Sequence, residues 1–274
     1  MPVYAKESSV FLAECLASIA GQTFPASEVL IVKDGPVGRD LDRVIDSFSS
    51  TLPIITIQLQ FNQGLGVALR AGLEKCRYDL VARMDSDDIC APRRFETQID
   101  FLARNPEIEV VGSSIAEFDS DPSKCISIRH LPEEHDEICA FAKWRNPLNH
   151  MSVLFRKHAV INAGSYRQVP GFEDYDLWAR MILNGARFHN LPEPLISARC
   201  GSGMQSRRGG IAYAGREVAL FWSFRKRGFL TFAEFLRNVA LRTPLRFLPQ
   251  SFREGFYRGW LRKPAKKDGG ILPG

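Results

Sequence analysis

The feature that most constrains this chain is a regular alternation of helical and strand-like segments over its first hundred residues. Leu12, Cys15, Leu16 and Ile19 recur at helical spacing, whereas the run EVLIVK is typical of a buried strand. Helices are expected at 7–20, 39–49 and 64–76, and strands at 28–33, 53–59 and 79–84. Such an alternation predicts βαβ crossovers, and therefore an α/β fold with a mostly parallel sheet.

From about residue 107 the pattern changes to shorter strands. The strands expected here, antiparallel at the start of the region, are 110–112, 115–118, 126–129, 152–155, 187–191 and 195–199. Further helices are expected to open at Pro92 and to cover 133–143, 173–184, 211–227 and 231–242. Ligands of open α/β sheets bind beyond the carboxyl ends of the strands, so polar turns at those ends are the first candidates for a site.

The uneven distribution of charge bears on partners. The 274 residues carry +5 overall, but residues 225–268 hold 12 Lys or Arg against three Asp or Glu, which leaves −4 for the remainder. Within 232–267 the basic residues alternate with aromatic residues and leucines, which fits either an anionic membrane surface or a helical pair packed on the domain. The acidic remainder and the lack of a recognisable motif argue against nucleic acid as a partner.

Cysteine usage and hydropathy indicate the compartment. The six cysteines form no CxxC pair and no cluster with zinc-site spacing, which favours reduced thiols. The first residues do not have the pattern of a signal peptide, and no run approaches the ~18 apolar residues of a spanning helix. We therefore expect a cytoplasmic protein, either free or peripheral on the inner face of the cell membrane.

The strongest local signal is Asp85-Ser86-Asp87-Asp88, directly after the strand expected at 79–84. Three carboxylates in four residues repel each other unless a positive group joins them. At the carboxyl end of a strand they form a hard oxygen site suited to Mg²⁺ or Mn²⁺, with water and substrate phosphates completing the shell. The alternative is a solvated acidic turn that caps the following helix.

A second acidic group lies in FEDYDLW, residues 172–178, at the start of the helix expected there. Acidic residues stabilise helix N-termini through capping and the helix dipole. Asp174 and Asp176 cannot both cap, however, and the apolar flanks would raise the pKa of a carboxylate towards values useful to a general base. A third segment, 201–210, combines glycines with Arg207 and Arg208, which suits either a diphosphate contact or a flexible linker.

Taken in order, these segments resemble the family 2 glycosyltransferases, which have a GT-A fold, and particularly the branch of bacterial exopolysaccharide and O-antigen assembly. The resemblance covers about residues 1–260. Its segments are 1–4 (MPVY), 18–25 (SIAGQTFP), 31–35 (IVKDG), 62–66 (NQGLG), 82–88 (ARMDSDD), 146–150 (NPLNH), 172–178 (FEDYDLW) and 204–210 (MQSRRGG). The ordered set is far more specific than any one of these motifs.

The resemblance implies an inverting transfer of a sugar from a nucleotide-diphosphate donor, UDP-linked by family habit, to a hydroxyl of a glycan or lipid-linked glycan. On the donor side it implies that Asp34 contacts the base, Asp85 the ribose or the metal shell, and that Asp87 ligates Mn²⁺ or Mg²⁺. On the acceptor side it implies that Asp174 is the general base and that Glu173 orients the site. The resemblance further implies contacts to the donor or acceptor from Arg83, His150, Arg207 and Arg208. It implies that Asp88 is a supporting acid or a helix cap.

The expected organisation is a GT-A catalytic domain over 1–210, with a donor half to about 106 and an acceptor half from 107. A basic helical extension over 211–267 and a disordered tail over 268–274 follow. The resemblance also implies apolar residues ahead of the segment MPVY, so we expect a truncated first strand and an incomplete nucleotide pocket. Two alternatives stay open: a truncated, inactive scaffold in polysaccharide assembly, and a nucleotidyltransferase, which would need a Gly-rich basic loop after the first strand.

Overall fold

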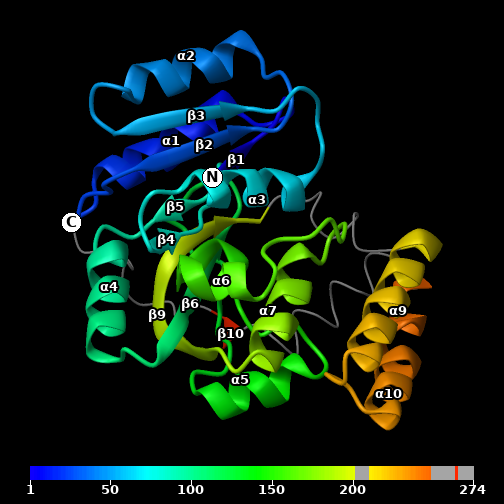
Figure 1. The fold of residues 1–274 in the computed structure, drawn as a ribbon. Helices are drawn as coiled ribbons and strands as arrows, with labels where there is room; N and C mark the ends of the chain where they lie inside the picture. The colour runs from blue at the N-terminus through cyan, green and yellow to red at the C-terminus, as the bar shows by residue number, and fades with distance from the viewer. Residues whose placement is uncertain (201–209, 248–262, 265–274) are drawn as a thin grey trace.

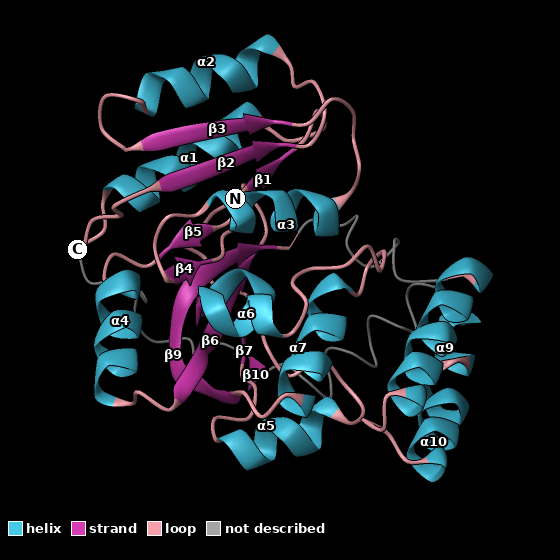
Figure 2. Cartoon of the chain, viewed as in Figure 1, coloured by secondary structure: helices cyan, strands magenta, loops and turns pink. Residues whose placement is uncertain are grey.

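The computed structural model describes residues 1–200, 210–247 and 263–264, which form two sheets flanked by helices (Figures 1 and 2). The first sheet is parallel and has the strand order β1-β2-β3. Its strands are β1 (Pro2–Val3), β2 (Val29–Lys33) and β3 (Ile54–Gln58). They alternate with the helices α1 (Ser9–Ala20), α2 (Arg39–Phe48) and α3 (Leu65–Lys75), as the sequence predicts.

Alternation along β2 explains why helices cover both faces of this sheet. Val29 and Ile31 belong to the cluster that contains the buried residues of α1 and α2, whereas Val32 lies against α3. A Cβ at Gly72 of α3 would lie 2.9 Å from Val32 Cγ2, so this close approach requires glycine. The buried residues of α1 are the four that the helical spacing predicts: Leu12, Cys15, Leu16 and Ile19.

The second sheet is mixed and has the order β10-β7-β6-β8-β4, with β9 paired to both β6 and β5. Its strands are β4 (Leu80–Ala82), β5 (Ile89–Cys90), β6 (Ile108–Phe118), β7 (Ser127–Arg129), β8 (Leu154–Arg156), β9 (Arg187–Arg199) and β10 (Lys263–Pro264). The helices packed on it are α4 (Arg94–Arg104), α5 (His135–Ala142), α6 (Lys157–Asn162) and α7 (Glu173–Leu183), and η1 (His150–Ser152) precedes β8.

Two long strands differ from the sequence prediction. The strands expected at 110–112 and 115–118 are one strand, β6, and those expected at 187–191 and 195–199 are one strand, β9. The two run parallel to each other, with register shifts where Ser113 and Ser114 pair with Leu191 and Pro194. The sequence pattern indicates that the strand ends before Pro192–Pro194. In the structure this stretch forms a β-bulge, and β9 continues through it. The short elements β5 and α6 are not anticipated by the sequence analysis.

The start of α4 is displaced from the prediction. The helix begins at Arg94 rather than at Pro92. The backbone N–H of Ala91 donates to Leu195 O of β9, at 3.0 Å, and Arg94 N–H closes a turn onto Ala91 O. Pairing with β9 therefore keeps the chain extended past β5 and delays the helix by two residues.

The first strand has two residues, and an apolar cavity lies beside it. β1 pairs only with Val32 and Lys33 of β2. A cavity of about 430 Å³ is lined by the starts of β2 and β4, together with Met1, Phe24 and Tyr78. Its lining extends along β4 to Met84, directly before the acidic turn, but does not include Asp34, Asp85, Asp87 or Asp88.

Beyond the sheets, α9 (Ile211–Lys226), α10 (Phe232–Arg242) and η2 (Pro244–Phe247) form a helical unit beside α7 (Figure 1). The buried carboxylate of Glu217 on α9 binds Arg242 of α10 at 2.7 Å and Arg246 of η2 at 2.6 Å. Burial alone would raise the pKa of Glu217, but the two arginines outweigh it and lower that pKa. None of the described helices is long and apolar enough to cross a membrane.

Glu217→Gln is expected to destabilise the fold by about 3–5 kcal/mol at pH 7, because it leaves the buried Arg246 and the half-buried Arg242 without their counter-charge. A lowered folded-state pKa contributes stability above the unfolded value of 4.5, and this contribution is lost as the pH falls through the lower folded value. The difference between the two proteins in urea unfolding should therefore shrink below pH 4.5.

Asp40→Asn is the matched control, because its pair with Arg43 is exposed and contributes about 0–1 kcal/mol. Equal unfolding midpoints for Glu217→Gln and Asp40→Asn would show that the ion cluster does not hold the helical unit.

Candidate active site

Three carboxylates converge on the turn between β4 and β5. Asp85, Asp87 and Asp88 each offer a ligand oxygen, and these atoms lie within 4.8 Å of one another. Asp88 is buried, and the other two are half-buried. The structure therefore brings together the acidic side chains that the sequence analysis assigns to a metal site.

The chemistry of this turn fits a divalent cation. Asp88 Oδ2 is buried and has no hydrogen-bond partner among the described residues. Burial, followed by the charges of Asp85 and Asp87, raises the pKa of Asp88 well above its ordinary value. Burial and Asp85 likewise raise the pKa of Asp87. A hard cation such as Mn²⁺ or Mg²⁺ would satisfy the free oxygen and offset the repulsion among the three carboxylates.

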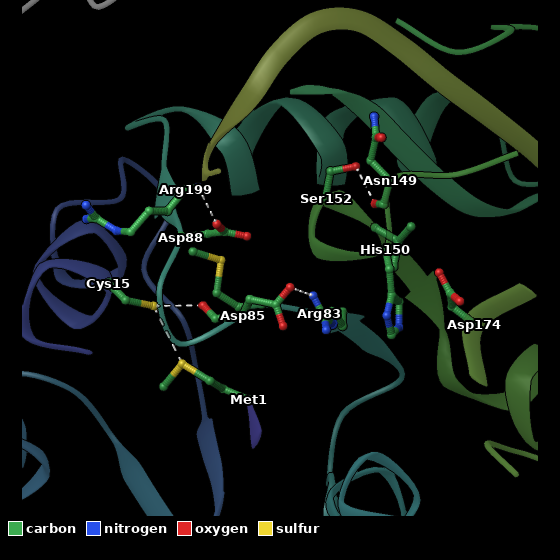
Figure 3. A network of polar contacts seen from close by, with 12 residues as sticks. Met1, Cys15, Arg83, Asp85, Asp88, Asn149, His150, Ser152, Asp174 and Arg199 are labelled. Carbon is green, nitrogen blue, oxygen red and sulfur yellow. Dashed lines mark hydrogen bonds and ion pairs between the residues drawn. The ribbon is translucent and has the colours of Figure 1, made fainter. Parts of the chain in front are cut away.

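Arg83 holds one side of the turn. Its guanidinium is buried and forms an ion pair with Asp85 (Figure 3). Burial disfavours the charged guanidinium, but the charge and hydrogen bond of Asp85 outweigh it and raise the pKa of Arg83. The carboxylate of Asp85 therefore contacts both Arg83 and the acidic cluster. Among the described residues, the carboxylates of Asp87 and Asp88 form no such ion pair with an arginine.

Asp174 lies in the first turn of α7, with both carboxylate oxygens engaged. Asn146 Nδ2 donates to Asp174 Oδ2 at 2.5 Å, and the backbone N–H of Tyr175 donates to Asp174 Oδ1 at 2.8 Å. Neighbouring Glu173 is buried and accepts from the backbone N–H of Gly171 at 3.0 Å. Burial raises the pKa of Glu173. The two acids therefore differ in their contacts. Glu173 binds the backbone of the loop before α7, whereas Asp174 accepts from the side-chain amide of Asn146.

Half-buried His150 and buried Tyr166 form a pair between the two acidic groups. His150 Nε2 lies 3.0 Å from the Tyr166 hydroxyl. Burial, followed by the charge of Arg83, lowers the pKa of His150 well below its ordinary value, so the imidazole is neutral. The charges of Arg83, Asp174 and Asp85 all act on the Tyr166 hydroxyl, whose pKa burial raises. Figure 3 shows Arg83, His150 and Asp174 on the same side of the acidic turn.

Asp176, the third acid of this helix start, has a structural role. It is fully buried and binds Arg180 of α7 at 2.9 Å and Arg227, just after α9, at 2.6 Å. This arrangement explains how two aspartates two residues apart are both accommodated: one faces the site and the other ties α7 to the helical unit.

Asp34 ends β2 and is buried, and its two oxygens accept from the backbone N–H groups of Gln63 and Gly64 at 2.7 and 2.9 Å. The carboxylate thus holds the turn into α3, and each oxygen keeps a lone pair for a further donor. Arg207 and Arg208 lie outside the described residues.

Sequence reasoning assigned no role to three residues that contact the site: Asn146, Tyr166 and Arg199. Asn146 belongs to NPLNH, a segment that the sequence analysis singled out. That segment gave no indication that Asn146 contacts Asp174. Tyr166 and Arg199 lie in segments without a motif. Their contacts depend on how distant strands and helices meet, which local pattern does not encode.

The sequence model of the family described as "Glycosyl transferase family 2" matches residues 1–169. This chain belongs to glycosyltransferase family 2. It is 40% identical to the amylovoran biosynthesis glycosyltransferase AmsE of Erwinia amylovora, over 93% of this chain and 95% of that protein. It is 36% identical to the UDP-Gal:α-D-GlcNAc-diphosphoundecaprenol β-1,3-galactosyltransferase of Escherichia coli, over 96% and 95% of the two chains. Both are similar along nearly their whole length.

Solved structures confirm the fold. Staphylococcus aureus TarS 1–349 in complex with UDP-GlcNAc superposes with a TM-score of 0.66 at 15% identity, covering 95% of this chain and 72% of that one. The mannosyltransferase PcManGT of Pyrobaculum calidifontis, in complex with GDP-Man and Mn²⁺, gives 0.66 at 16% identity over 94% and 74%. The α/β GT-A fold predicted from sequence is therefore confirmed. The family model and the relatives at 36–40% identity show that the enzyme is a glycosyltransferase rather than a nucleotidyltransferase.

Asp87→Asn is expected to weaken Mn²⁺ binding at least about tenfold, because it removes a charged oxygen ligand from the turn. The dissociation constant is measured by electron paramagnetic resonance of free Mn²⁺, without substrate. Asp100→Asn on the exposed side of α4 is the control and should bind as the unmodified enzyme does. Equal affinities for the two variants would place the cation elsewhere.

Proposed function

We propose that this glycosyltransferase moves a sugar, with inversion, from a nucleotide-diphosphate donor to a hydroxyl of a lipid-linked glycan in surface-polysaccharide synthesis. The observation that carries the proposal is the placement of the acidic turn and Asp174 around one group formed by Arg83, His150 and Tyr166. A UDP-sugar is the preferred donor, and a diphosphate-linked lipid the preferred acceptor carrier, because the E. coli relative is named for both.

On the donor side, Asp87 and Asp88 would hold Mn²⁺ or Mg²⁺, with Asp85 positioned by Arg83 at the edge of the same cluster. Such a cation would supply positive charge to the leaving nucleoside diphosphate. Asp34, at the carboxyl end of β2, accepts from the nucleotide base through its remaining lone pairs. Arg207 and Arg208 supply guanidinium contacts to the diphosphate.

On the acceptor side, Asp174 is the general base. Its carboxylate takes the proton of the acceptor hydroxyl as the hydroxyl oxygen bonds to the anomeric carbon. The bond from that carbon to the phosphate oxygen breaks, and its electron pair leaves with the nucleoside diphosphate. A single displacement of this kind inverts the configuration. Glu173 orients the start of α7, and the neutral His150 with Tyr166 lines the space between the donor and acceptor sides.

Asp174→Asn is expected to lower transfer about 10²–10⁴-fold, because the amide cannot accept the proton, while nucleotide affinity stays unchanged. Transfer is measured with radiolabelled donor, and binding by calorimetric titration of UDP, GDP and dTDP with Mn²⁺. Unchanged transfer would refute the assignment of the base. If the unmodified chain bound none of the three nucleotides, the scaffold alternative would be favoured.

We also propose that α9 and α10 bind an anionic membrane surface, which would bring the site to a lipid-linked acceptor. The exposed aromatic residues Trp222 and Phe232 both contact Phe235, and Leu236 of the same helix is exposed as well. Lys226 lies over the Trp222 ring, and Arg237 is exposed beside Leu236. The acids of 211–247, Glu217 and Glu234, both pair with basic side chains. An apolar surface edged by basic side chains complements an anionic bilayer.

Lys226→Gln and Arg237→Gln are each expected to weaken partition onto phosphatidylglycerol-containing vesicles about fivefold, since one basic residue near the surface contributes about 1 kcal/mol. Co-sedimentation with these vesicles, and with purely zwitterionic ones as reference, measures the effect. Arg104→Gln on exposed α4 is the control. Equal partition of all three variants, or of the enzyme onto both vesicle types, would contradict an electrostatic membrane contact.

A further inference from the structure

Arg199 contacts both acidic residues at the end of the candidate metal turn. It is the last residue of β9 and is buried. Its backbone N–H donates to Asp88 Oδ1 at 2.9 Å (Figure 3). Its side-chain Nε donates to the carbonyl oxygen of Asp87 at 3.3 Å. A residue more than a hundred positions along the chain thus fixes the Asp88 carboxylate and the Asp87 backbone together.

The guanidinium of Arg199 is itself held from two sides. Its terminal nitrogen binds Glu14 of α1 at 2.5 Å. Its carbon lies 3.7 Å from the ring centre of Phe11 and 4.6 Å from that of Phe118. A planar guanidinium that stacks and donates in several directions at once has little freedom to move, and lysine cannot reproduce this arrangement. The segments α1, β6 and β9 therefore meet at the metal turn through one side chain.

We propose that Arg199 is a positioning residue for the metal-binding turn, holding Asp87 and Asp88 in the orientation in which their carboxylates converge on a cation. The inference rests on the proposed function, because it takes the turn to be the metal site. Arg199 acts through the turn and not on the substrate. Groups that orient metal ligands in this way commonly change metal affinity about 10–100-fold when removed.

An electrostatic role and a positioning role of Arg199 predict opposite effects of its substitution on Mn²⁺ affinity. The positive charge of Arg199 acts on Asp87 and would, by itself, weaken attraction of a cation. If Arg199 acted only as a charge, Arg199→Met would tighten Mn²⁺ binding, and Arg199→Lys would leave it unchanged. If it positions the turn, both variants weaken Mn²⁺ binding, because neither provides the fork that joins Glu14 to the Asp87 carbonyl.

The experiment measures the Mn²⁺ dissociation constant of the full chain by electron paramagnetic resonance, without donor or acceptor, so that activity is not the readout. Arg199→Met and Arg199→Lys are expected to raise the constant about tenfold or more. Arg180→Met is the matched control: it also removes a buried arginine paired with an aspartate, but on α7. It should lower thermal stability and leave Mn²⁺ affinity unchanged.

Glu14→Gln covers the case in which the arginine variants fail to fold, because Glu14 is partly exposed and only the outer hydrogen bond of Arg199 is weakened. A smaller rise in the dissociation constant is expected. Mn²⁺ affinity equal to that of the unmodified chain in every folded variant, with Asp87→Asn still impaired, would overturn this inference alone. Absence of Mn²⁺ binding by the unmodified chain would overturn both it and the proposed metal site.

Discussion

The candidate active site depends on three carboxylates held close together in the turn between β4 and β5. Mutual repulsion and burial both oppose their ionised forms, and the raised pKa of Asp88 reflects that cost. Arg83 offsets part of this repulsion by pairing with Asp85. On the other side of the turn, Arg199 donates from its backbone N–H to the Asp88 carboxylate and from its side chain to the Asp87 carbonyl oxygen. The negative charge that remains, together with an unpartnered buried oxygen, suits a divalent cation.

The rest of the fold brings distant segments to this turn. Pairing with β6 positions β9 so that its last residue, Arg199, contacts the turn. The segment around η1 places His150 between the turn and Asp174. Asp176 and Glu217, each buried against two arginines, tie α7, α9 and α10 into one unit, so that the start of α7 is fixed. Buried ion clusters at successive interfaces thus hold the candidate donor and acceptor sides in one orientation.

The sequence predicted the elements whose pattern is local. The four buried residues of α1 and the strand β2 follow from apolar spacing, and the cluster of Asp85, Asp87 and Asp88 follows from their adjacency. It was wrong about β6 and β9, because their continuity depends on cross-strand pairing that overrides the break at Pro192–Pro194. Asn146 and Arg199 escaped prediction for a similar reason: their partners lie 28 and more than 100 residues away. The domain boundaries and the roles of the site residues stay predictions.

In the proposed arrangement, one cation site and one base face each other across a single reaction centre. Crystals grown with UDP and Mn²⁺, with anomalous data collected at the manganese edge, would reveal both. We expect an anomalous peak ligated by Asp87 or Asp88 and by the UDP diphosphate, with Asp174 on the side where the donor sugar would extend. A peak at other carboxylates, or Asp174 turned away from the bound nucleotide, would contradict the proposed arrangement.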